Sequence, residues 1–203
     1  LFGKNASAGV INVVTKRPGD KVAGYVEALA TTDEEYKVRG AIDLPMGENV
    51  AARITANYGR FDGLVRNITL NRTVNGYERW GVRGLVEANA GDALKFTLIG
   101  DYRKQNSDCC AEVIGTRPAG ALAGSLIGVD LKGDATREIR QDQITVTKET
   151  SWGVSLQADL DVGGAGTLTS ISAYRKYRNY GIRDGDFIDT VYNIAGGNQL
   201  HDY

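Results

Sequence analysis

The sequence is poor in the residues that build metal centres, and it has no long apolar run. One His and two adjacent Cys cannot supply the ligand spacing of a zinc cluster, so we expect neither a metal site nor another bound cofactor. No stretch approaches the ~18 to 20 consecutive apolar residues of a membrane-spanning helix. These absences exclude a zinc protein and an α-helical membrane protein.

An excess of charge of one sign is also lacking. The formal net charge is −1, so the chain has no dominant basic surface for a nucleic acid. A content of 42% hydrophobic residues excludes a disordered chain. The sequence gives no independent support for a Ser-His-Asp, Cys-His or paired-carboxylate arrangement. We therefore expect no catalytic residues and no enzyme activity.

Glycine is abundant and proline is scarce. The chain has 26 Gly and 3 Pro, a balance that favours extended strands joined by tight turns over helices. Apolar and polar residues alternate with a period of two, which is typical of strands with one wet face. The pattern predicts about seven antiparallel strands, in the segments 22–31, 35–45, 50–59, 80–89, 94–103, 143–161 and 167–180. In the segment 167–180 the alternation does not show which residues lie on which face.

The predicted connections alternate between short and long. Three short turns rich in Gly and Asp lie at 45–49, 90–93 and 162–166, and two long segments lie at 66–77 and 105–141. Short turns on one rim and long loops on the other are typical of an outer-membrane β-barrel. The short connection around TTDEE, on the long side, is an exception.

Bulky aromatic residues recur at a fixed distance from the short turns. Ten to twelve residues separate each of them from the centre of its turn, a rise of about 28 Å for tilted strands and close to the ~25 Å apolar belt of such barrels. We interpret them as a lipid-facing aromatic girdle, made of Tyr36, Tyr58, Trp80, Tyr102, Trp152 and Tyr174.

The even-numbered face then points to lipid and the odd-numbered face to a water-filled lumen. On this interpretation the lumen is lined by charged residues, namely Arg39, Arg53, Arg83, Glu87, Lys95 and Asp101. A soluble antiparallel β-sandwich shares the alternation, because its apolar faces cover each other. It predicts neither aromatic residues at one height nor a strand as long as 143–161. The pattern therefore favours an antiparallel transmembrane β-barrel.

The opening segment differs from every strand that follows. GVINVVTK is apolar on both faces, so we expect burial on both sides. LFGKNASAGVINVVTKRP resembles the end of the plug domain of TonB-dependent outer-membrane receptors. The resemblance assigns residues 1–18 to the C-terminal end of the plug and 19–203 to the N-terminal part of the barrel. The matching plug-end residues include Gly3, Asn5, Gly9 and Asn12.

The resemblance implies a fragment of a 22-stranded barrel filled by a plug, located in the bacterial outer membrane. Such receptors import bulky nutrients, most often ferric siderophores and also cobalamin, haem or glycans. The implied partners are outer-membrane lipid, an extracellular small molecule, and the TonB complex, which engages a box that we expect to precede this chain. Two alternatives stay open at this point: a passive outer-membrane porin and a soluble β-sandwich binding module.

Two adjacent cysteines, Cys109 and Cys110, fall in the second long connection. That connection lies on the side assigned to the oxidising exterior, where disulfides persist. A bond between neighbouring cysteines is geometrically unfavourable. We therefore expect disulfides to partners elsewhere, or free thiols.

Overall fold

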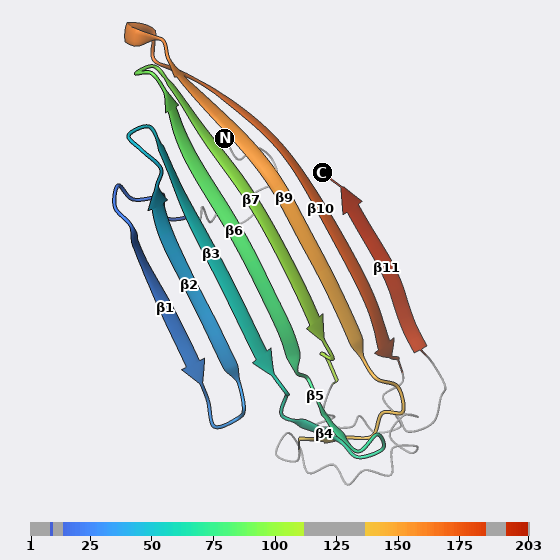
Figure 1. Ribbon diagram of the computed structural model, residues 1–203. Coiled ribbons are helices and arrows are strands. Elements are labelled where there is room, and N and C mark those ends of the chain that lie inside the picture. The colour runs from blue at the N-terminus through green and yellow to red at the C-terminus, as the bar shows by residue number, and fades with distance from the viewer. Residues whose placement is uncertain (1–8, 10–13, 112–136, 186–193, 203) are drawn as a thin grey trace.

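The fold is all-β. The computed structural model describes residues 9, 14–111, 137–185 and 194–202. Eight strands form one sheet in which each strand pairs with its neighbours in antiparallel fashion (Figure 1), which confirms the predicted fold class. In order across the sheet they are β1 (Ala23–Ala30), β2 (Tyr36–Pro45), β3 (Val50–Phe61), β6 (Tyr77–Ala90), β7 (Leu94–Ser107), β9 (Val146–Asp161), β10 (Thr167–Asp184) and β11 (Ile194–Asp202).

The large sheet has one strand more than the alternation predicted. The additional strand, β11, pairs with β10 in a segment with little alternation of apolar and polar residues. A second, three-stranded sheet is made of β4 (Val65–Asn67), β5 (Arg72–Val74) and β8 (Glu138–Ile139). It forms within segments that we expected to be long connections, so these contain regular structure of their own.

The two ends of the large sheet differ as the connection lengths predicted. One end carries the β2–β3 and β6–β7 hairpins and the short 3-10 helix Gly163–Ala165 between β9 and β10. The small sheet lies at the other end (Figure 1). Gly47 and Gly91 occupy the hairpins with φ of 99° and 70°, values that side chains with a Cβ rarely adopt. The Met46 amide donates to the Val50 carbonyl at 2.8 Å and closes the first hairpin.

The large sheet is open in the described part of the chain. β1 and β11 each pair with one strand, so each leaves one edge unpaired. The hydrophobic cluster identified in the described ranges, Val74, Ala111 and Ile139 with Val65 packed against it, lies by the small sheet. The described ranges contain no helix with the length and apolar character needed to cross a bilayer.

Candidate functional site

The large sheet has two chemically different faces. Each register pairs even-numbered residues with even and odd with odd, as in Tyr58 with Trp80 and Tyr102 with Trp152. Side chains directly opposite each other lie on the same face of a sheet. We call the face with the even-numbered residues the apolar face and the other the polar face. Most of the exposed large hydrophobic residues of the sheet are even-numbered.

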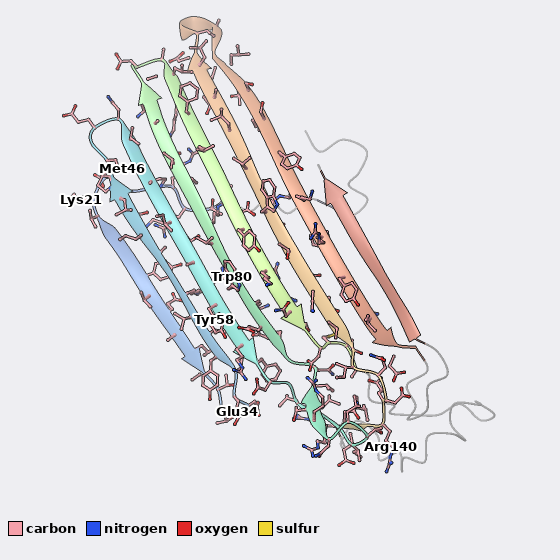
Figure 2. The ribbon with its side chains drawn as sticks, turned by 45° about the vertical axis from the view of Figure 1, so that its right-hand side comes forward. Lys21, Glu34, Met46, Tyr58, Trp80 and Arg140 are labelled. Carbon is pink, nitrogen blue, oxygen red and sulfur yellow. A yellow bond between two sulfur atoms is a disulfide. The ribbon has the colours of Figure 1, made fainter. Side chains whose placement is uncertain are left out.

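Five predicted girdle residues form a continuous line on the apolar face. Tyr58 lies opposite Trp80, and Figure 2 shows these two on neighbouring strands. The ring of Trp80 stacks on Tyr102 at 5.0 Å between centroids. Tyr102 lies opposite Trp152, whose ring is 5.4 Å from that of Tyr174. The structure therefore brings together aromatic residues from β3, β6, β7, β9 and β10.

Tyr36 lies on the same face of β2, beyond the end of this line. It pairs with Arg60, whereas the partner of Tyr58 is Val38. Tyr36 is therefore displaced by two residues along the strand from the row that holds Tyr58. Tyr36 lies further from the hairpin end than Tyr58 does. The other five aromatic residues also lie progressively further from that end in going from β10 to β3.

The aromatic line is inclined to the hydrogen-bonded rows. Tyr58 and Trp80 share one row, Tyr102 and Trp152 share the next row on this face, and Tyr174 lies one further row along, opposite Val154. The line therefore shifts by about one residue for each strand crossed. With ~3.4 Å per residue and ~4.8 Å between strands, its inclination is about 35°.

This inclination matches the strand tilt of a membrane barrel. Strands of such barrels tilt by ~35–45°, so a plane parallel to the membrane crosses the sheet along a line inclined by the same angle. Residues on the observed line would therefore lie at one height in a barrel wall. Contact of these side chains with lipid stays a prediction.

The residues between the aromatic line and the hairpins make a charge-free belt on the apolar face. On the six strands that carry predicted girdle residues, none of the even-numbered residues between the line and the hairpins is charged. Ser170 and Ser172 on β10 are the polar side chains in this belt. Charged residues begin directly beyond the line, at Arg60, Glu78 and Lys104. The change from apolar to charged residues is therefore abrupt.

The polar face carries all six residues that we predicted to line the lumen, and each contacts a polar partner. Arg53 donates to Asp43 at 2.5 Å, and both side chains are buried. The contacts of the others are Arg39 with Glu27, Arg83 with Thr15 at 3.2 Å, Glu87 with Lys95 at 3.2 Å and also with Arg17, and Asp101 with Arg175 at 2.6 Å.

Sequence reasoning did not single out the partners of these charged residues. Asp43 has an odd number within a clear alternation, so the pattern could have placed it beside Arg53 once the register was known. Arg175 lies on β10, where the alternation did not assign the faces. The reason is visible in the structure, because Ser170 and Ser172 lie on the apolar face and Ile171 on the polar one.

The N-terminal segment lies against the polar face. Thr15 accepts a hydrogen bond from Arg83, Lys16 lies 3.9 Å from Asp43, and Arg17 pairs with Glu87. Thr15 and Lys16 line a cavity of about 200 Å³ together with side chains of β1, β3 and β6. Of the predicted plug-end residues, Gly9 is exposed and has a φ of 145°. Gly3, Asn5 and Asn12 lie outside the described residues.

The small sheet and residues 107–111 form a compact unit that we call the outer lobe. Asp108 accepts hydrogen bonds from the Gly76 amide at 2.6 Å and from Arg72 at 2.8 Å. Asn75 exchanges two hydrogen bonds with the backbone of Ala111, at 2.8 and 2.7 Å. Both ends of the cysteine-bearing turn therefore form hydrogen bonds with β5 and the loop that follows it.

The expectation for the cysteines was wrong. Cys109 and Cys110 form a disulfide with each other, rather than with distant partners or not at all. Hydrogen bonds of Asp108 and Ala111 flank the turn that carries this disulfide.

An open hollow of about 830 Å³ separates the outer lobe from the end of the large sheet. Its lining mixes both signs of charge, including Glu34, Arg60, Arg72 and Asp108. Beside it, Glu35 accepts hydrogen bonds from Lys37 at 2.7 Å and from the Tyr77 hydroxyl at 2.6 Å. These donors, Lys37 first, hold the pKa of the Glu35 carboxyl below its usual value. The ranges that the structure describes contain no group of three potential metal-ligating side chains.

Comparison with known proteins gives one partial similarity. Over 110 residues, 53% of this chain, the sequence is 30% identical to the vitamin B12 transporter BtuB of Photobacterium profundum. The match covers 18% of that protein, so the chain spans less than a fifth of it. No protein-family profile matches the sequence. No solved structure matches it either.

Proposed function

We propose that this chain is part of the barrel wall of a TonB-dependent outer-membrane receptor, which imports a bulky nutrient. The inclined aromatic line carries the proposal, because its angle fits the strand tilt of a membrane barrel. The partial similarity to a vitamin B12 transporter supports it independently. The proposed place of action is the bacterial outer membrane.

The charge-free belt supports a lipid environment for the apolar face. The side chains of Tyr58, Trp80, Trp152 and Tyr174 are 38–42% exposed, and nothing in the described ranges covers them. A β-sandwich would require a second sheet over this face. Hydrocarbon solvates such a surface, provided that the backbone groups of each strand are paired. Additional strands at β1 and β11 would meet this condition, as in the 22-stranded barrel that the resemblance implies.

The N-terminal segment supports a plugged barrel over a passive porin. Residues 15–17 lie on the polar face and contact Asp43, Arg83 and Glu87. A wall with chain packed on its lumen side fits a receptor whose plug passes into the first strand. We propose the boundary between plug and barrel at residues 18 and 19. We assign the chain no catalytic role, so the substrate would cross chemically unchanged.

For the substrate we propose a ferric siderophore, which is the commonest cargo of the family that the opening segment resembles. Cobalamin is the second candidate, because the relative is named as a vitamin B12 transporter. The proposed energy source is a TonB complex that engages the receptor near its N-terminus. The open hollow beside the outer lobe is the proposed place of first contact, because it faces away from the hairpin end of the sheet.

The test is deletion of the gene in its host, with complementation by the wild-type gene. We expect deletion to abolish growth on one ferric siderophore, or uptake of labelled cobalamin, and complementation to restore it. A protonophore should block the restored uptake. Uptake that survives the protonophore would favour the porin. Unchanged uptake across ferric siderophores, cobalamin, haem and glycans would contradict the proposal.

A further inference from the structure

We infer that a cavity on the polar face of β1, β2, β3 and β6 binds a ligand through a carboxylate group. The cavity has a volume of about 660 Å³ and shares no lining residue with the open hollow beside the outer lobe. Small-molecule sites commonly have volumes of about 300–1,000 Å³. The inference rests on the proposed function, because it places the ligand on the lumen side of a barrel wall. It deepens that function by naming the substrate class, a bulky nutrient that carries carboxylate groups.

The sheet register gathers the polar side chains of the cavity from neighbouring strands. Lys37 on β2 and Arg79 on β6 lie opposite Gly59 of β3, one on each side of it. Arg39 lies opposite Asn57 in the next row of the polar face. All five residues line the cavity. A ligand in the cavity would therefore meet side chains from several strands at once.

The cavity carries one positive charge more than its carboxylate partners balance. Arg39 pairs with Glu27, and Lys37 pairs with Glu35 at 2.7 Å. In the described part of the chain, Arg79 forms no ion pair. The three cations and two carboxylates therefore leave a surplus of one positive charge, which is located at Arg79.

Tyr77 holds the Arg79 side chain in place without neutralising it. The guanidinium carbon of Arg79 lies 4.3 Å from the centre of the Tyr77 ring, a cation–π contact. The Tyr77 hydroxyl accepts a hydrogen bond from Arg79 at 3.5 Å and donates one to Glu35 at 2.6 Å. A guanidinium can donate two parallel hydrogen bonds to one carboxylate. Because Arg79 is already positioned, it loses little side-chain freedom when a ligand binds.

Gly59 leaves space in the cavity that the backbone does not require. If a Cβ were added to Gly59, its three nearest heavy atoms would be side-chain atoms at 3.4–3.7 Å, and the φ of Gly59 lies outside the region that favours glycine. Gly24 differs, because a Cβ there would lie 2.6 Å from the carbonyl oxygen of Ala41. Glycine weakens the interior of a strand and often marks a place where a ligand approaches closely. Gly59 therefore points to an occupant of the cavity.

The surplus charge selects a carboxylate over a phosphate. A carboxylate carries one negative charge, whereas a phosphate monoester carries about −1.5 to −2 at pH 7. The side-chain amide of Asn57, which forms no hydrogen bond within the described ranges, supplies a further donor and acceptor. Exposed Leu29 adds an apolar contact. We therefore expect a ferric chelate with carboxylate groups to bind more tightly than a neutral ferric trihydroxamate.

The test is ligand titration of the full-length gene product in non-ionic detergent. The probes are ferric rhizoferrin, a chelate built on two citrate units, and ferrichrome, a neutral trihydroxamate. R79Q removes the surplus charge, and G59V fills the cavity without a change of charge. R178Q and G84V are the matched controls, because they make the same kinds of change on the apolar face and neither position lines the cavity.

We expect R79Q to weaken binding of ferric rhizoferrin by about tenfold or more, and G59V by about fivefold or more. R178Q and G84V should change it by less than about twofold. Unchanged binding in R79Q or in G59V would overturn the inference, as would tighter binding of ferrichrome than of ferric rhizoferrin. A protein that inserts into bilayers and binds ferrichrome equally well with and without R79Q, but not ferric rhizoferrin, contradicts the carboxylate site alone. A protein that stays soluble without detergent contradicts the proposed function as well.

Discussion

Trp80 stacks on Tyr102 across two strands although the two residues are not opposite each other in the sheet. Trp80 pairs with Lys104, and Tyr102 pairs with Val82. The contact is therefore diagonal, and it carries the aromatic line from one hydrogen-bonded row to the next. The same diagonal step joins Trp152 to Tyr174. Two such steps produce an inclination that fits the strand tilt of a membrane barrel.

The diagonal ring contact predicts a measurable coupling between Trp80 and Tyr102. In a double-mutant cycle with W80A and Y102A, we expect a coupling free energy of about 0.5–1.5 kcal/mol. The measurement is the free energy of unfolding in lipid vesicles. W80A with Y58A serves as the comparison, because Tyr58 lies opposite Trp80 and no ring contact between them accompanies that pairing. Coupling near zero for W80A/Y102A would show that the rings do not stack.

Charge on the apolar face should interfere with insertion. Leu156 is 43% exposed in the charge-free belt, and its neighbour Gln157 lies on the polar face beside Asp159. We expect L156R to destabilise the inserted protein by about 2–4 kcal/mol. Q157R is the matched control, and we expect a change below about 1 kcal/mol because the carboxylate of Asp159 can pair with it. Equal effects of the two variants, measured as unfolding free energies in vesicles, would argue against a lipid-facing belt.

The buried pair of Asp43 and Arg53 should matter more than the exposed pair of Glu27 and Arg39. Removal of Arg53 leaves the buried carboxylate of Asp43 with the exposed Lys16, 3.9 Å away, as its cationic neighbour, so we expect R53L to cost about 3–5 kcal/mol. R39L removes an exposed pair and should cost no more than about 1 kcal/mol. The double variant D43L/R53L should recover part of the loss. If R53L and R39L destabilise the protein equally, the pair at Asp43 is not buried in the assembled wall.

The disulfide between Cys109 and Cys110 predicts a simple labelling pattern. Without reductant, neither thiol should react with a maleimide under denaturing conditions, and two should react after reduction. A chain cleaved between the outer lobe and β9 should not stay linked through these residues, because both lie on the same side of the cut. Labelling before reduction, or a disulfide-linked second fragment, would contradict this pairing.

Regular strands could be predicted from the sequence because apolar and polar residues alternate along them. Val38, Ile42 and Leu44 occupy one face of β2 as the period of two requires, and the same holds for β3, β6 and β7. β11 was missed because AGG in its first half supplies no side chain that distinguishes the faces. The outer lobe was missed because strands of two or three residues are too short to show a period.

The sequence predicted which face of the large sheet each aromatic or charged side chain occupies. The number of each residue placed the six aromatic and six charged side chains on opposite faces, since parity is preserved across every register of the large sheet. The sequence could not supply the register itself, which determines that Arg53 meets Asp43 and that Arg79 lies opposite Gly59. Pairing across strands depends on contacts far apart in the chain, and the period of one strand carries no information about them.

The depth of the aromatic residues tests the central claim most directly. Residues 58, 80, 102, 152 and 174 would each be replaced by a spin-labelled cysteine, in a C109S/C110S background of the full-length gene product in bilayers. Accessibility to oxygen and to a water-soluble nickel complex then reports the depth of each label. We predict equal depths to within about 3 Å, the rise of one residue. A label at residue 174 that lies ~14 Å from the depth of residue 58, as the four-residue offset gives if the rows run parallel to the membrane, would contradict the account.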